Sequence, residues 1–308
     1  MSPVRLKIGT RGSPLALWQA NHVKANLEAL APGADVGIVV IKTSGDRIQD
    51  RALIEVGGKG LFVKEIQVAL LEGSVDLAIH SLKDYPVENP PELTLACVPR
   101  REDPRDALVL PPGVPGDALR ADARVGTGSL RRHYQAALLH PGWRIEGLRG
   151  NVETRLRKVD EGELDGTILA AAGLRRLGME GRITRLFTPD EMIPAVGQGA
   201  LAVETRRDRE DVGAVLAPFQ DPEARLRVDA ERRFLEGLGG SCTTPMGIHA
   251  SLEGGRMVLR AFLASLDGSR HLKGREEGPA SEAIAMADRL LARFWADGAR
   301  DLLEEGAQ

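Results

Sequence analysis

The chain has 308 residues, enough for two or three domains with sizeable cores. Apolar residues make up 43% and charged residues 28%, as in ordinary globular proteins, and the net charge of −3 argues against general nucleic-acid binding, which needs a basic face. Two cysteines and six histidines show neither a disulfide framework nor metal-ligand spacing. No apolar signal core follows Met1 and no run approaches eighteen apolar residues, so we expect a cytoplasmic protein without membrane or metal.

The first hundred residues alternate between strand-like and helix-like runs. Apolar runs predict strands at residues 4–8, 36–41, 76–79 and 93–98. Helical periodicity follows Ser13-Pro14, which is typical of a helix start, and again residues 61–71. The polar, glycine-rich stretch 43–60 is too long for an ordinary connection, so we expect a mobile loop or lid there. This order predicts a βαβ domain with a parallel or mixed sheet.

The alternation restarts after the charged link at residues 99–105. A second unit spans 105–194, and residues 197–205 return as a further strand of the first unit. Such an insertion predicts two lobes, with crossing hinge strands near 99–105 and 194–200 and a cleft between the lobes. The remainder reads as a helix at 223–238, strand-like runs at 249–252 and 257–266, and one amphipathic helix at 281–304. We therefore predict an α/β protein with lobe 1 at 1–99 and 200–218, lobe 2 at 105–194, and a small C-terminal α+β domain at 222–308.

Three strand-to-helix junctions each combine glycine, a small polar capping residue and arginine. They span residues 9–13, 126–132 and 149–155. The N–H groups of a helix start face a bound anion, and guanidinium grips carboxylate or phosphate with two donors. Any single arginine is more often a solvated surface residue, but chance surface arginines have no reason to follow such caps three times. The repetition predicts a ligand with many negative groups.

Two further segments carry candidate chemistry. Lys83-Asp84 lies just past a predicted strand, at the sheet edge where doubly wound folds bind ligands, although a plain turn aspartate before Pro86 fits this fragment equally well. Cys242 lies among small residues in a turn, whereas Cys97 lies inside an apolar run. We therefore favour a reactive thiol at Cys242 over an inert one.

Nine motifs, in their order and spacing, resemble the porphobilinogen deaminase (hydroxymethylbilane synthase) family. They are GTRGSPLALWQ, TSGD, GGKGLFVKE, HSLKDYP, VGTGSLRR, LRGNVETRL, AAGLRRLG, PAVGQGAL and GGSCTTP. The resemblance implies two lobes like those of periplasmic binding proteins and a third domain that bears a cysteine. It also implies a transferase of tetrapyrrole (haem) biosynthesis that joins four porphobilinogen molecules head to tail into hydroxymethylbilane and releases ammonia. The implied cofactor is dipyrromethane attached covalently to Cys242, and the implied protein is a monomer whose product passes to a tetrapyrrole-cyclising enzyme.

The resemblance also implies roles for individual residues, because every pyrrole ring carries an acetate and a propionate. Asp84 would be the catalytic acid–base group, with Lys83 beside it. The implied cofactor-binding residues are Cys242, Arg131, Arg132, Arg155, Ser129, Thr127, Asp46, Ser81 and Asn151. The implied substrate-binding residues are Arg11, Ser13, Gln19, Arg149, Arg176, Gln198, Lys59 and Phe62. Tyr85 stands where we expect an aliphatic residue, and its phenol can alter the local packing.

Three other classes share part of this pattern. A two-lobed binding protein for an anionic solute would share the lobes and the arginines, but it needs neither Asp84 nor Cys242 and usually has a secretory signal. An anion-sensing transcription regulator would need a helix-turn-helix, whereas this chain begins with a strand. A phosphoribosyl transferase would need an acidic pair for magnesium, which the sequence does not show. The intact mass separates enzyme from binding protein, because the cofactor adds two pyrrole units.

Overall fold

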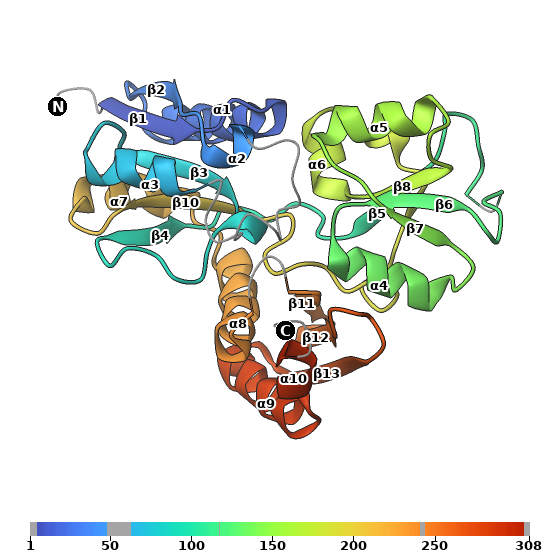
Figure 1. Ribbon diagram of the computed structural model, residues 1–308. Coiled ribbons are helices and arrows are strands. Elements are labelled where there is room, and N and C mark those ends of the chain that lie inside the picture. Colours follow the sequence, from blue (N-terminus) through green and yellow to red (C-terminus); the bar gives the residue numbers. More distant parts are fainter. Residues whose placement is uncertain (1–4, 48–62, 117, 241–243, 305–308) are drawn as a thin grey trace. The chain divides into compact units, whose positions relative to one another are not determined.

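The computed structural model describes residues 5–47, 63–116, 118–240 and 244–304 (Figure 1). The chain packs into two compact units. Unit 1 comprises Met1–Glu102 and Ala200–Leu226, and unit 2 comprises Asp103–Gly199 and Arg227–Gln308. Unit 2 contains lobe 2 together with the C-terminal sheet. Among the described residues no helix combines the length and the apolar character needed to cross a membrane.

Unit 1 is built on a five-stranded mixed sheet with the order β2-β1-β3-β10-β4. Strand β1 pairs in parallel with β2 and β3, whereas β10 is antiparallel to β3 and β4. The strands are β1 (Arg5–Thr10), β2 (Asp35–Val40), β3 (Leu77–Ser81), β4 (Leu93–Cys97) and β10 (Leu201–Arg206). The helices are α1 (Pro14–Leu30), α2 (Ser44–Arg47), α3 (Lys64–Leu71), the 3₁₀ turn η1 (Leu82–Asp84), α7 (Glu210–Leu216) and the 3₁₀ turn η3 (Ala217–Phe219).

Helices α1 and α3 cover opposite faces of this sheet, because successive side chains of a strand point to opposite sides. Leu77 and Ile79 of β3 belong to the core under α1, whereas Ala78 between them packs in the core under α3. The predicted start of α1 is confirmed, since the Ser13 side chain accepts a hydrogen bond from the Ala16 N–H at 3.3 Å. Within the predicted loop 43–60, residues 44–47 form helix α2 and residues 48–60 lie outside the described ranges.

Lobe 2, within unit 2, repeats this plan with the strand order β7-β6-β8-β5-β9. Strand β6 is parallel to β7 and β8, and β5 is antiparallel to β8 and β9. The strands are β5 (Asp106–Val109), β6 (Arg124–Thr127), β7 (Arg144–Gly147), β8 (Gly166–Ala170) and β9 (Arg185–Leu186). The helices are α4 (Leu130–Leu139), α5 (Val152–Asp160), α6 (Ala171–Arg176) and the 3₁₀ turn η2 (Glu180–Arg182). Leu108 of β5 faces the α4 core, and Ala107 and Val109 face the α5–α6 core.

The C-terminal part of unit 2 is a three-stranded antiparallel sheet, β11-β12-β13, that packs against α9. Its elements are α8 (Pro222–Leu238), β11 (Met246–Glu253), β12 (Arg256–Ala264), β13 (His271–Pro279), the 3₁₀ turn η4 (Ala280–Glu282), α9 (Ala283–Ala296) and α10 (Ala299–Glu304). Helix α9 lies close on β13, since a Cβ at Gly274 would be 2.6 Å from the Phe294 ring. The expected single helix at 281–304 is wrong, because Gly298, with φ of +93°, separates α9 from α10.

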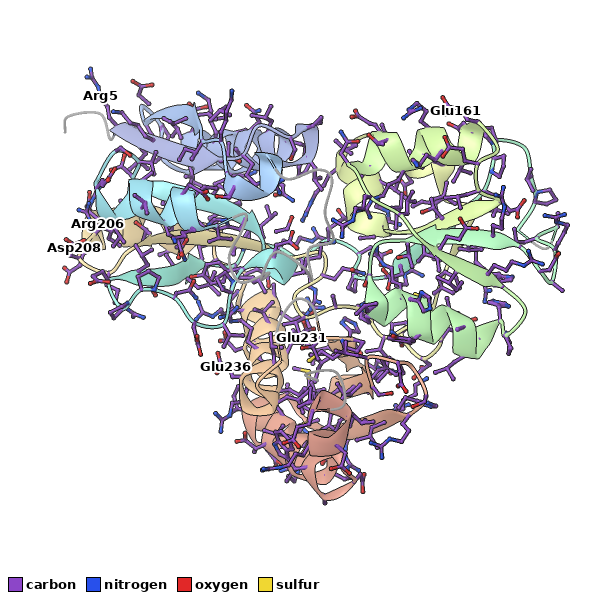
Figure 2. All side chains as sticks on the ribbon, in the orientation of Figure 1. Arg5, Glu161, Arg206, Asp208, Glu231 and Glu236 are labelled. Carbon is purple, nitrogen blue, oxygen red and sulfur yellow. The ribbon has the colours of Figure 1, made fainter. Side chains whose placement is uncertain are left out.

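Glu231 of α8, labelled in Figure 2, joins the C-terminal sheet to the segment before β10. Its fully buried carboxylate accepts the Gly197 N–H at 2.6 Å and the Ala250 N–H of β11 at 2.8 Å. These two bonds compensate the cost of burying the charge. The predicted α/β class, with two lobes and a small C-terminal domain, is confirmed.

Candidate active site

Five of the predicted site residues line one pocket in unit 1. Arg11 and Ser13 follow β1, Gln19 comes from α1, and Ser81 and Asp84 come from the end of β3 and from η1. The Gln19 side-chain amide donates to the Ser81 hydroxyl at 2.8 Å. The pocket therefore lies at the carboxyl ends of two neighbouring parallel strands, as predicted for Asp84. Ser81, expected at the cofactor, lies here beside residues expected at the substrate.

Asp84 presents its carboxylate on the exposed end of a tightly held turn. Leu82, at the start of the turn, is buried, and its N–H donates to the Ala200 carbonyl at 3.0 Å. The Tyr85 N–H donates back to the Leu82 carbonyl at 3.0 Å, which closes the turn. Lys83 is half-buried beside it. The turn thus fixes a carboxylate beside a pocket that also contains the Arg11 guanidinium.

In lobe 2, Arg131 and Arg132 of α4 share one buried carboxylate, that of Asp106. Arg131 Nη1 is 2.7 Å from Asp106 Oδ2, and Arg132 Nε is 2.8 Å from Oδ1. Gln198, expected at the substrate, belongs to this cluster, because its amide donates to Asp106 Oδ1 at 2.9 Å. Burial raises the pKa of Asp106, but the charges of Arg131 and Arg132 outweigh that effect and lower it to about 2.

One donor of this cluster is not used by the Asp106 carboxylate. Arg131 is 3% exposed, and its Nε–H has no hydrogen-bond partner among the described residues. A buried donor without an acceptor is costly, so this Nε–H would gain from an acceptor supplied from outside the described residues.

The second and third arginine junctions adjoin each other in lobe 2. A Cβ at Gly128 would lie 2.5 Å from the Leu148 carbonyl oxygen and 3.6 Å from Arg155 Nη2, so the β6–α4 turn needs glycine to approach β7. The Arg155 Nε–H donates to the Gly150 carbonyl at 2.9 Å. The 3.6 Å distance from the Gly128 Cβ position shows that the Arg155 guanidinium lies beside the turn that starts α4.

The small polar residues of these junctions have different local roles. Thr127 is buried, and its hydroxyl accepts the Ser129 N–H at 3.3 Å, while the Ser129 side chain makes no capping bond to α4. Asn151 caps α5 by accepting the Thr154 N–H at 2.8 Å. Arg149 is exposed. The Thr127 hydroxyl and the Arg155 guanidinium therefore lie beside the turn that starts α4, and Asn151 belongs to the start of α5.

Arg176, at the end of α6, is buried, and its Nη2 donates to the Gly199 carbonyl at 2.7 Å. Four predicted site residues lie where the structure describes no side chain: Cys242, Lys59, Phe62 and Asp46. No group of three His, Cys, Asp or Glu side chains suited to a metal ion occurs in the described ranges.

Sequence reasoning missed the buried acids that hold the site together. Asp106 opens the buried strand β5, and Glu204 ends an apolar run in β10, yet both side chains are fully buried. An acidic residue in an otherwise apolar strand sequence could have predicted both, because a carboxylate is buried in a strand only when it has bonding partners.

Solved structures with partial fold similarity include solute-binding proteins. The methionine-binding protein MetQ is 13% identical, with a TM-score of 0.45, over 72% of this chain and 92% of that chain. The aliphatic sulphonate-binding protein SsuA from Escherichia coli is 14% identical, with a TM-score of 0.41, over 76% of this chain and 70% of that chain.

Family comparisons cover nearly the whole chain. Residues 6–214 match a family model described as the dipyromethane cofactor binding domain of porphobilinogen deaminase, and residues 225–295 match the C-terminal domain of the same family. Porphobilinogen deaminase of Roseiflexus sp. (strain RS-1) is 49% identical over 97% of this chain and 98% of its own length. That of Thiobacillus denitrificans is 48% identical, again over 97% and 98%. With two matched domains in order and relatives of this identity along both full lengths, the chain belongs to the porphobilinogen deaminase family.

Proposed function

We propose that this protein is a transferase of tetrapyrrole biosynthesis that condenses four porphobilinogen molecules head to tail into hydroxymethylbilane and releases ammonia. The observation that carries this proposal is the unit 1 pocket, which gathers the Asp84 carboxylate and the Arg11 guanidinium at the carboxyl ends of β1 and β3. The family relationship along the whole chain supports the same reaction. It does not favour the alternative of an anionic-solute-binding protein.

The Asp84 carboxylate stabilises the positive charge that develops on the substrate as ammonia leaves. Loss of the amine from the aminomethyl group of porphobilinogen leaves a methylene-pyrrolenine cation, and a fixed carboxylate nearby stabilises that cation. The same carboxylate accepts the proton that the ring carbon loses when the new bond forms, and the resulting carboxylic acid gives that proton to the next leaving amine. Arg11 cannot do this, because guanidinium stays protonated, so Arg11 and Lys83 bind the acetate and propionate groups instead.

The remaining predicted residues bind the cofactor and the growing chain. We assign Cys242 as the thioether attachment point of dipyrromethane, which supplies the pyrrole ring to which the first substrate is joined. The family relationship supports this assignment, because the matched family model is a dipyromethane cofactor binding domain. Arg131, Arg132 and Arg155 would hold the cofactor carboxylates, and the other cofactor-binding residues would be Thr127, Ser129, Asn151, Asp46 and Ser81. The substrate rings would bind to Arg149, Arg176, Gln198, Ser13, Gln19, Lys59 and Phe62.

The cellular setting follows from the same proposal. The protein works as a cytoplasmic monomer and passes hydroxymethylbilane to an enzyme that closes the tetrapyrrole ring. We also propose the three-domain division, with lobe 1 at 1–99 and 200–218, lobe 2 at 105–194 and the C-terminal domain at 222–308.

The decisive experiment replaces Asp84 with asparagine, which keeps the shape but not the charge. We expect Asp84→Asn loaded with cofactor to consume porphobilinogen about a hundredfold more slowly or worse, the usual cost of losing a preorganised charge. Because one carboxylate serves all four condensations, no intermediate should accumulate. Asp208→Asn is the matched control, because Asp208 is an exposed aspartate of the same unit (Figure 2). Near-normal consumption by folded, cofactor-loaded Asp84→Asn would contradict the proposal.

A further inference from the structure

Glu204 lies at the centre of a buried network attached to the Asp84 turn. Its carboxylate is fully buried on β10. Oε1 accepts from the Gln67 amide at 2.8 Å and from the Tyr85 hydroxyl at 3.0 Å, and Oε2 is 3.1 Å from His80 Nε2. Three partners thus compensate the burial of one carboxylate, and hydrogen bonds to a buried charge are strong.

The network makes contacts with the chain both before and after Asp84. His80 lies on β3, four residues before Asp84, and also lines the active-site pocket. Tyr85 follows Asp84 directly, and its ring is 5.6 Å from the His80 ring, centre to centre. Glu204 therefore ties the strand that enters the turn to the first residue that leaves it.

A second set of hydrogen bonds holds the residues that follow Tyr85. Gln67 of α3 donates from the same amide nitrogen to Asn89 Oδ1 at 2.8 Å. The Asn89 amide in turn donates to the carbonyls of Pro86 at 3.0 Å and Val87 at 3.3 Å. The segment after Asp84 is thereby connected to helix α3 and, through Gln67, to Glu204.

We propose that Glu204 is a positioning residue for Asp84 and acts through Tyr85 and His80. This inference rests on the catalytic role proposed for Asp84. The Asp84 carboxylate is exposed, and its own turn spans only three residues, so its position depends on what holds the flanking residues. Neither Glu204 nor Tyr85 is among the residues that line the pocket. Loosening the network therefore moves Asp84 without removing a group that binds substrate.

Tyr85→Phe tests this directly, because it removes one hydroxyl and keeps the ring. We expect kcat to fall about tenfold, since misplacing a reacting group by about 1 Å costs up to roughly a hundredfold. KM should stay unchanged, because the pocket lining is intact. Tyr134→Phe is the matched control, since Tyr134 is the chain's other tyrosine and its hydroxyl also donates a hydrogen bond, to the Leu266 carbonyl in unit 2. It should keep a normal kcat even where its melting temperature falls as much as that of Tyr85→Phe.

A double-variant comparison separates positioning from a general loss of structure. If Tyr85 acts through Asp84, the double variant Asp84→Asn/Tyr85→Phe should turn over no more slowly than Asp84→Asn alone. Glu204→Gln keeps the shape of the side chain and an acceptor oxygen, so we expect it to lower kcat at constant KM, with little further loss when Tyr85→Phe is added.

The outcomes distinguish the two proposals. A normal kcat in Tyr85→Phe beside a nearly inactive Asp84→Asn would overturn the positioning role and leave the role of Asp84 intact. Multiplied losses in the double variant would also overturn positioning, because they mean that Tyr85 acts independently of Asp84. Near-normal turnover by Asp84→Asn would overturn both proposals.

Discussion

Replacing Asp106 with asparagine should destabilise lobe 2 strongly, because this carboxylate is the shared partner of two buried guanidinium groups. The asparagine side chain would fill nearly the same space and keep one acceptor oxygen. It would remove the negative charge that Arg131 and Arg132, 3% and 5% exposed, share in the native protein. Removing one member of a buried ion cluster typically costs about 3–5 kcal/mol, since an uncompensated charge remains in the interior.

The lowered pKa of Asp106 has the same cause, its interaction with Arg131 and Arg132. Its pKa falls from the ordinary 3.8 to about 2. A shift of this size corresponds to roughly 2 kcal/mol of favourable interaction with the ionised form. Because the folded-state pKa lies below the unfolded value, this contribution is complete above about pH 4 and is lost as the pH falls through about 2. At pH 7, Asp106→Asn therefore loses this whole contribution to the free energy of unfolding.

Urea unfolding at pH 7, followed by tryptophan fluorescence, measures the loss of stability. The matched control is Asp122→Asn, because Asp122 also pairs with an arginine of lobe 2, Arg120, but the two side chains are 63% and 65% exposed. Exposed ion pairs contribute about 1 kcal/mol or less, so the control should unfold close to the parent. We expect Asp106→Asn to lose about 2–5 kcal/mol, a range that runs from the free energy of the pKa shift to the usual cost of breaking a buried ion cluster. A loss no larger than that of Asp122→Asn would refute the reasoning that Asp106 compensates buried charge.

Two further predictions use the mass of the purified protein. Arg132→Leu should lack the added mass of two pyrrole units, because it breaks the buried cluster that we propose binds the cofactor carboxylates. Arg149 is exposed, so Arg149→Leu should keep that mass and stall during elongation. Equal cofactor occupancy in the two variants would contradict this division of roles. Cys242→Ser should yield folded protein without the added mass. Cys97 should stay unmodified in the folded protein, because burial raises the pKa of its thiol to about 12. An adduct on Cys97 would contradict the assignment of Cys242 as the attachment point.

Local signals in the sequence predicted the lobe elements well. The apolar run before Gly9 and the Ser13-Pro14 pair predicted β1 and the start of α1, and both follow from short-range chemistry. Strand β13 was missed, because its sequence HLKGREEGP is mostly polar and exposed. It forms a strand because its backbone pairs with β12 along its whole length, a long-range effect that composition does not reveal.

In the candidate site, too, local motifs predicted the functional residues but not their distant partners. Motif positions predicted that Arg11, Ser13, Gln19, Ser81 and Asp84 are functional, and the fold brings these five to one pocket. The partners of the predicted residues could not be predicted, because they are distant in sequence: Asp106 pairs with residues 25 and 26 positions away. The specificity of a buried contact depends on tertiary packing, whereas a cap or a turn depends only on neighbours.

Three fully buried carboxylates organise the segments on which the functional residues lie. Glu204 connects β10 to the Asp84 turn, Asp106 holds the two arginines that begin α4, and Glu231 holds Gly197 and Ala250. A protein that binds a polyanion needs many arginines, and clustered arginines repel each other unless acids lie among them. Internal acids supply that compensation at Asp106, and the chain as a whole stays near neutral at −3. Because each buried acid must keep all of its partners, the segments that it joins have little freedom to move apart. The buried acids that compensate the positive charge of the arginines therefore also hold these segments in fixed positions. A catalyst that repeats one condensation four times requires such fixed positions of its functional groups.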